Sequence, residues 1–292
     1  MSIKSIREIV SINEHAVLET GVQLDWYWDK ERNLRLCRGY MFSSGSKYYG
    51  NKTSAVNLLS IFKDNLLDDS KENKHIVISG YGTGKTHFAL VVANYFSRAS
   101  DSDEITGIYE ALESSTSKEI VANFRKFKET GKLPQLVVRL RGDAFINLRS
   151  GFLKALKEAL AENPLSRNYQ IPVICTNALK WVKNLDNIQR KKAEEFLLNN
   201  YKINLLQLQQ KLENFEPMSD TRTEELFKNL FNVSPNFGAE ANLETVIKQV
   251  YSDLCSKPEG PFYKIVIIFD ELGLYIDNYR ADSIKAGGVA LQ

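Results

Sequence analysis

Residues 79–86 have the sequence Ser79-Gly80-Tyr81-Gly82-Thr83-Gly84-Lys85-Thr86, and the apolar triplet 76–78 precedes them. The glycines allow backbone amides to turn toward one anion, and the dipole of a following helix would favour the same charge. Lys85 would reach the β- and γ-phosphates of a nucleotide, and Thr86 would offer its hydroxyl to Mg²⁺. The stretch therefore predicts a phosphate-binding loop between a core strand at 76–78 and a helix continuing from His87.

The usual pattern of such loops, G-x-x-x-x-G-K-[ST], has glycine where this chain has Ser79. Serine is small, and Gly80 and Gly82 keep the loop permissive, so the motif is short by one residue but tolerable. The residues predicted to contact the nucleotide are Gly80, Tyr81, Gly82, Thr83, Gly84, Lys85, Thr86 and His87. For His87 a packing role in the first turn of the helix is the commoner alternative.

A second signal lies far downstream, where the apolar run 265–269 ends in Asp270 and Glu271. Such a run is typical of a strand buried on both faces of a parallel sheet. Asp270 would hold Mg²⁺ together with Thr86, and Glu271 would orient and polarise the water that attacks the γ-phosphate. The two motifs together predict ATP and Mg²⁺ as cofactors, with Glu271 and Lys85 as catalytic residues. ATP is favoured over GTP because the chain has no guanine-specifying N-K-x-D.

Composition allows a sizeable core, since the 292 residues are 43% apolar and 25% charged. The net charge of +2 gives no overall attraction to nucleic acid or to an anionic membrane. Cys37, Cys175 and Cys255 are widely separated, which favours buried thiols over a disulfide framework or a zinc site. No apolar segment approaches the length of a membrane span, and the predicted location is the cytoplasm.

The sequence predicts an α/β fold, a P-loop core with a mainly parallel sheet and a large helical insertion. Residues 1–50 form an amino-terminal lead-in packed on the core, and residues 51–142 form the first part of the core. The insertion covers 143–260, and the core continues over 261–292 with the second motif. Only 21 residues follow Glu271, too few for a further strand with a sensor residue, so the chain is expected to be a truncated part of a longer protein.

Hydrophobic periodicity places the individual elements. Alternation over 33–38 predicts a half-buried strand, Ser54 caps a predicted helix, and 136–140 is another core strand. Residues 144–162 and the uninterrupted pattern 187–215 predict helices. Two more helices are expected at about 222–231 and 240–255, before the strand that begins near Lys264.

Other side chains are weaker candidates. Arg139, Arg141 and Asp143 follow or end a core strand, where ligands of α/β sheets gather, and are predicted to support the site. Arg280 would act as a sensor or finger, although a surface arginine is the more common identity. Tyr48 and Tyr49 would stack on adenine, with ordinary packing as the alternative. The basic run 190–192 is followed by two glutamates, which favours a solvated helix face over phosphate contact.

The segments 80–88 and 267–273, in this order, resemble the corresponding motifs of the large P-loop ATPases of bacterial BREX and Pgl-type anti-phage systems. This AAA-like or RecA-like resemblance covers two short motifs, with Ser79 as a departure, and nothing in residues 1–50 matches. It implies a very long native chain with an amino-terminal ATPase region and a mainly helical remainder. DNA or other defence-system proteins would be partners, and oligomerisation would be compatible with the family.

The sequence thus predicts Mg²⁺-dependent ATP binding and hydrolysis. The alternative is a nucleotide-gated switch or scaffold that hydrolyses little and recruits partners through its helical insert. A nucleotide kinase is disfavoured by the size of that insert and by Glu271 directly after Asp270.

Overall fold

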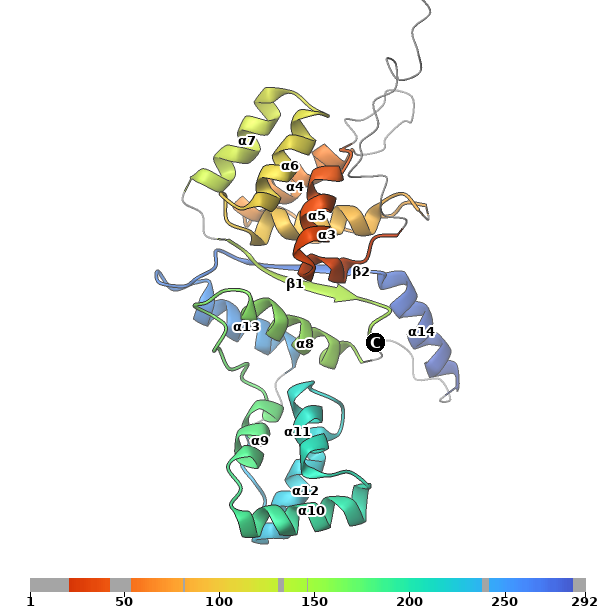
Figure 1. Ribbon diagram of the computed structural model, residues 1–292, viewed down its shortest axis with the longest axis vertical. Coiled ribbons are helices and arrows are strands. Elements are labelled where there is room, and N and C mark those ends of the chain that lie inside the picture. Colours follow the sequence, from red (N-terminus) through yellow and green to blue (C-terminus); the bar gives the residue numbers. More distant parts are fainter. Residues whose placement is uncertain are drawn as a thin grey trace, which may run out of the picture. The chain divides into compact units, whose positions relative to one another are not determined.

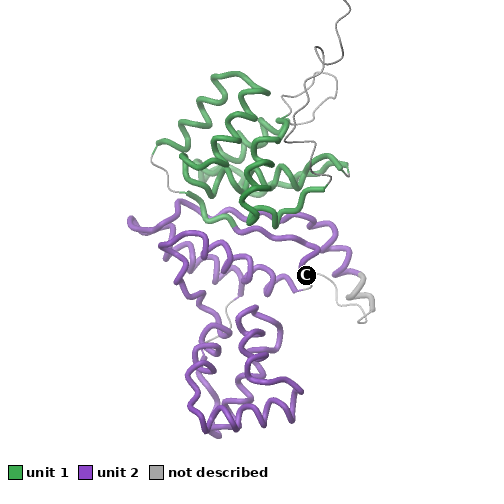
Figure 2. The backbone as a smooth tube through the Cα atoms, in the orientation of Figure 1, with its two compact units in different colours: residues 1–137 green, residues 138–292 purple. Residues whose placement is uncertain are grey.

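A computed structural model describes residues 21–42, 54–80, 82–130, 134–145, 147–237 and 242–285, with side chains described as far as Arg280. The chain divides into two compact units, residues 1–137 and 138–292 (Figure 2). Helices make up most of each unit, and the described strands form one parallel pair (Figure 1). The fold is therefore α/β, as the sequence predicts.

The first unit is built around α5 (Lys85–Ser97), which contacts η1 (Leu24–Trp28), α3 (Lys30–Gly39) and α6 (Asp103–Glu113). Two further helices in the described part of this unit are α4 (Ala55–Leu67) and α7 (Lys118–Glu129). Apolar side chains cover α5 on several sides, as expected of a buried helix, and the buried ones include Phe88, Leu90, Val91, Val92, Tyr95 and Phe96. Each such side chain contributes about 1.5–3 kcal/mol when it is fully buried.

Polar bonds inside this core fix how the helices meet. Asn33 of α3 and Asn94 of α5 are fully buried and exchange amide hydrogen bonds of 2.9 and 2.7 Å. Tyr95 donates to the carbonyl of Phe124 in α7 at 3.0 Å. Because a buried polar group without a partner is costly, these bonds favour one arrangement of α3, α5 and α7.

Two predicted strands of this unit are absent from the part of the chain that the structure describes. Residues 33–38 belong to α3, whose start is capped by the Asp29 side chain accepting from the Arg32 amide at 3.1 Å. The six-residue alternation was too short to exclude a helix, and the cap favours one. Residues 76–78 form no strand, and Ile76 and Ile78 are 80% and 88% exposed. A strand requires backbone hydrogen bonds from a neighbour, and the structure shows none for this triplet.

The helix predicted after Ser54 is confirmed as α4, with the Ser54 hydroxyl accepting from the Asn57 amide at 3.1 Å. The predicted helix after the glycine-rich loop is confirmed as α5. In contrast, α6 was not predicted, because its residues 103–113 begin in a run of polar residues that suggested a loop. The Ser102 hydroxyl caps this helix, and Asp103 and Glu104 in the first turn favour its dipole.

The second unit holds most of β1 (Leu136–Arg141), which pairs in parallel with β2 (Ile265–Asp270). Figure 1 shows α8 (Leu148–Ala161) and α13 (Leu243–Leu254) along one face of this pair. β1 is largely buried, which confirms the predicted core strand, whereas β2 is half-exposed along its length. The prediction that β2 is buried on both faces is wrong for the described part of the chain, because none of its six side chains is fully buried and Ile267 is exposed.

A helical cluster formed by α9 (Ile174–Lys183), α10 (Asn187–Tyr201), α11 (Leu205–Glu213) and α12 (Ser219–Phe231) lies between α8 and α13 in the sequence, and its helices contact one another. The single long helix predicted over 187–215 is in fact α10 and α11. Lys202 adopts a left-handed conformation (φ 57°), and Asn204 with Gln207 forms a capping box that starts α11. The helices predicted near 222–231 and 240–255 are confirmed as α12 and α13, and α14 (Leu272–Lys285) follows β2.

The cysteines are free, and Cys37 and Cys175 are buried as predicted, whereas Cys255 is half-buried. Burial raises the pKa of all three thiols, that of Cys255 to about 11. Thiolates are therefore disfavoured at neutral pH, and the three groups act as packing residues.

Candidate functional site

The glycine-rich segment lies in the first unit and leads directly into α5. Gly82 and Gly84 have φ values of 72° and 82°, and Gly84 occupies the cap position before Lys85. Side chains with a Cβ rarely adopt this conformation, so the two glycines are needed for the backbone path. Tyr81, predicted to contact the nucleotide, lies outside the described residues.

Hydroxyl groups close the loop internally and give Ser79 a role. The Thr83 hydroxyl donates to the Gly80 carbonyl at 2.9 Å, and the hydroxyls of Ser79 and Thr83 lie 2.6 Å apart. Because a hydroxyl has one proton, the Thr83 oxygen must accept from Ser79. The residue that departs from the usual pattern therefore ties the start of the loop to its centre.

The Lys85 ammonium spans the same loop. It donates to the carbonyls of Ser79 and Gly80 at 3.0 and 2.8 Å. Lysine has three N–H donors on a flexible stem, so the group can exchange a carbonyl for a phosphate oxygen without moving the helix. The structure thus places the predicted cation at the mouth of the glycine-rich loop.

Backbone donors at the start of α5 complete this part of the site. The first backbone hydrogen bond of α5 runs from the Phe88 amide to the Gly84 carbonyl at 2.9 Å. The amides of Lys85, Thr86 and His87 precede it and have no intrahelical acceptor. Together with the helix dipole they form the arrangement that binds phosphate at helix N-termini, and the half-buried Thr86 lies among them.

The His87 side chain contacts α3 and Tyr40. Its Nε2 atom bonds the Leu36 carbonyl of α3 at 2.8 Å, and its ring meets that of Tyr40 edge-on at 4.8 Å. Burial lowers the pKa of this imidazole, an effect that the hydrogen bond to Leu36 partly opposes. The neutral ring therefore donates to Leu36, and only the backbone amide of His87 remains for a ligand.

The two predicted acids end β2 in the second unit. Asp270 is half-buried and is the last residue of the strand, and its carbonyl accepts from the Gly142 amide at 2.9 Å. Glu271 is exposed and adopts a left-handed conformation with φ 56°. Its carbonyl accepts from the Tyr275 amide at 3.1 Å, which starts α14. Such a backbone conformation is uncommon outside glycine and is concentrated at functional turns.

The end of β1 reaches the same edge, because β1 and β2 are parallel and paired. Arg141 donates to both carboxylate oxygens of Asp143, at 3.0 and 2.5 Å. This bond holds the pKa of Asp143 below its ordinary value. Arg139, predicted with them, instead pairs with Glu162 at the end of α8 and is nearly buried. Two of the three supporting candidates therefore lie at this edge: Arg141 is the last residue of β1, and Asp143 follows the strand.

Three aromatic rings pack together near the ends of β1 and β2, a cluster that the sequence did not suggest. Phe145 follows β1, Phe269 belongs to β2 and Tyr275 to α14, and their ring centroids lie 5.4–5.8 Å apart. Pairs at this distance add about 0.5–1.5 kcal/mol beyond their burial. The sequence also offered no reason to expect a role for Gly142, because a lone glycine after a strand carries no distinctive signal.

Several candidates receive no support as site residues. Arg280 is exposed on α14, and Tyr48 and Tyr49 lie outside the described residues. Arg190 donates to the carbonyls of Lys183 and Leu185 at 3.0 and 2.9 Å, which caps the end of α9. Arg190, the first member of the basic run 190–192, is exposed, in agreement with the predicted solvated helix face.

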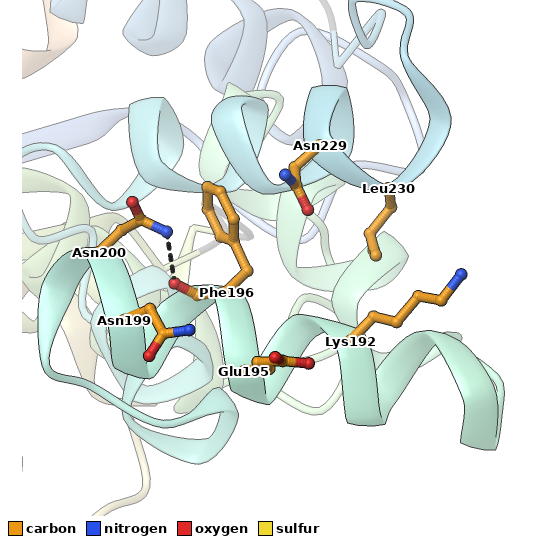
Figure 3. Close-up of a pocket in the computed structure, with 7 residues that line it drawn as sticks. All are labelled: Lys192, Glu195, Phe196, Asn199, Asn200, Asn229 and Leu230. Carbon is orange, nitrogen blue, oxygen red and sulfur yellow. Dashed lines mark hydrogen bonds between the residues drawn. The ribbon is translucent and has the colours of Figure 1, made fainter.

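A depression of about 280 Å³ lies between α10 and α12, in the helical cluster (Figure 3). Phe196 and Leu230 point into the space between these helices, and the rim is polar. The Asn200 amide donates to the Phe196 carbonyl at 2.8 Å. None of the predicted site residues lines this depression.

Within the described ranges, no three histidine, cysteine or acidic side chains gather as a metal centre would require. The predicted Mg²⁺ ligands, the Thr86 hydroxyl and the Asp270 carboxylate, include only one such side chain. No helix in the same ranges has both the length and the apolar character needed to cross a bilayer.

Comparison with known protein families, curated proteins and solved structures found no significant match. The functional argument therefore depends on the residues of this chain.

Proposed function

We propose that this chain binds Mg·ATP through residues 79–87 and hydrolyses it, as part of a P-loop ATPase. The observation that supports this most is the loop itself. Gly82 and Gly84 hold left-handed conformations, and Lys85 spans the loop mouth directly before a helix whose first amides lack intrahelical acceptors. A triphosphate is the common ligand whose charge and oxygen acceptors fit such an arrangement.

Each residue would have a distinct role. Lys85 and the amides of 85–87 would neutralise phosphate charge, and Thr86 and Asp270 would hold Mg²⁺. Bound Mg²⁺ would supply charge neutralisation on the β- and γ-phosphates. Glu271 would orient a water and accept its proton as the water oxygen bonds the γ-phosphorus. The bond from that phosphorus to the β,γ-bridging oxygen would break, which gives ADP and inorganic phosphate.

The loop assignment is tested by ATP binding to Lys85→Ala, with exposed Lys74→Ala as the matched control. We expect the dissociation constant for ATP to rise at least tenfold in Lys85→Ala, because one charge-assisted contact is lost, and to stay unchanged in Lys74→Ala. Titration calorimetry with the folded proteins measures it. Unchanged affinity in Lys85→Ala would contradict the assignment.

The hydrolytic role is tested separately by Glu271→Gln, with exposed Glu259→Gln as its control. The amide keeps the shape of the side chain but does not accept the proton, so we expect ATP affinity to remain and turnover to fall by about 10²-fold or more. Phosphate release under steady state measures turnover. Full activity in Glu271→Gln would remove its role as base, and binding without turnover in the wild type would favour a nucleotide-gated switch.

The resemblance to anti-phage ATPases extends the proposal to a larger cytoplasmic machine that acts on DNA or with other defence proteins. Hydrolysis would then drive movement of the helical cluster or of such an assembly. Turnover measured with and without DNA tests this extension. Faster turnover in the presence of DNA would support the extension. Equal turnover with and without DNA, at every salt concentration over a range, would oppose it.

A further inference from the structure

We propose that Gly142 is a positioning residue that holds Glu271 in its catalytic conformation. The inference rests on the proposed function, because it assigns a role to Gly142 through the proposed general base. Both residues belong to the second unit, where the end of β1 meets the turn between β2 and α14.

Gly142 packs against the backbone of Glu271 more closely than any other residue type allows. A Cβ atom at position 142 would lie 2.2 Å from the Glu271 carbonyl oxygen and 2.9 Å from its carbonyl carbon. It would also lie 3.0 Å from the Cβ of Tyr275. Two of these three neighbours are backbone atoms, which cannot rotate away as a flexible side chain would. The restriction is purely steric, since Gly142 is not among the glycines with positive φ.

The same glycine also holds the residue before Glu271, because its amide donates to the Asp270 carbonyl at 2.9 Å. On the other side, the Glu271 carbonyl accepts from Tyr275 at 3.1 Å in the first turn of α14. The left-handed conformation of Glu271 (φ 56°) is therefore held from three directions. An unfavourable conformation persists only where its surroundings impose it, and such residues concentrate at active sites.

A side chain at position 142 would displace the carbonyl of Glu271 and with it the direction of its carboxylate. Ordinary contact distances require a shift of roughly 1 Å, and misplacement of that size costs about 10²-fold in catalysis. The loop at 79–87 is not involved in these contacts. The effect is therefore expected in the chemical step and not in nucleotide affinity.

The test compares Gly142→Ala with Gly273→Ala, in which the new methyl group meets no atom within 4 Å. We expect kcat to fall about 10- to 100-fold in Gly142→Ala, with the ATP dissociation constant within about twofold of wild type. Gly273→Ala should keep both values. Unchanged kcat in Gly142→Ala, or loss of ATP affinity equal to the loss of kcat, would overturn the inference.

A double variant separates positioning from a general structural role. If Gly142 acts through Glu271, adding Gly142→Ala to Glu271→Gln should not lower the residual turnover further. A second full loss in the double variant would show that Gly142 acts by another route.

Hydrogen exchange on the wild-type chain keeps the inference testable if Gly142→Ala does not fold or the wild type has no turnover. We expect the amides of Gly142 and Tyr275 to exchange at least tenfold more slowly than unstructured amides, because both are bonded to the Asp270–Glu271 turn. Exchange of either amide at the unprotected rate would overturn the packing on which the inference rests. Absence of turnover with slow exchange would refute the proposed hydrolysis and with it the catalytic role of Gly142, whereas the packing of Gly142 against Glu271 would stand.

Discussion

Ser79 stands where the usual loop pattern has glycine, and its hydroxyl has taken over a structural task. It donates to Thr83, whose own proton goes to the Gly80 carbonyl. A glycine would offer flexibility at this point, whereas serine adds a bond that limits the conformations of the loop. The departure from the motif is therefore compatible with a phosphate-binding loop.

His87 makes stability depend on pH. Burial lowers its pKa from the ordinary value of 6.5, so the unfolded chain takes up a proton at a higher pH than the folded chain. The free energy of unfolding should therefore fall as pH falls below about 6.5 and continue to fall until the folded imidazole also titrates. Between about pH 7 and about pH 5, the free energy of unfolding of His87→Gln should fall less than that of the wild type. Urea unfolding at the two pH values measures the difference.

The matched control for this prediction is His75→Gln, since His75 is an exposed histidine of the same unit. Parallel pH profiles for wild type and His87→Gln would contradict it.

The break between α10 and α11 shows how one residue divides a helical pattern. Apolar and polar residues continue without proline or glycine across 187–215, so periodicity predicts one helix. Lys202 nevertheless turns left-handed, and the capping box at Asn204 starts the next helix. Caps of this kind contribute about 1 kcal/mol, and here tertiary contacts among α9–α12 decide that the turn is used.

A glycine at position 202 should stabilise the protein. Lys202 is exposed and left-handed, so Lys202→Gly removes a steric cost and should raise the free energy of unfolding by about 1 kcal/mol. Lys191→Gly, in the exposed middle of α10, should lower it by about 1 kcal/mol. Urea unfolding measures both, and a loss of stability in both variants would contradict the left-handed turn.

The two compact units carry different halves of the proposed chemistry. The loop, with its cation and helix amides, belongs to residues 1–137, and the acids at the end of β2 belong to residues 138–292. In the proposed function, one bound nucleotide would contact both the loop and the acids. Ligand binding in solution tests this requirement.

Asp270→Asn tests that requirement through Mg²⁺. ATP at about 100 times its dissociation constant stabilises a folded protein by about 2.7 kcal/mol, which raises the melting temperature. In the wild type we expect Mg²⁺ to add to the shift given by ATP. Asp270→Asn should lose the added part and keep the shift of ATP without Mg²⁺, whereas exposed Asp277→Asn should keep both. Equal Mg²⁺ increments in wild type and Asp270→Asn would remove Asp270 as a metal ligand.

Local signals in the sequence were enough to predict α4, α5, β1, β2, α12 and α13, and the loop before α5. Caps, left-handed glycines and hydrophobic periods act between residues a few positions apart, so a single sequence reveals them. The tertiary structure alone decided that 76–78 has no strand partner among the described residues. It also placed Gly142 against Glu271. These outcomes depend on hydrogen bonds and steric contacts between segments far apart in the chain, which leave no pattern in the local sequence.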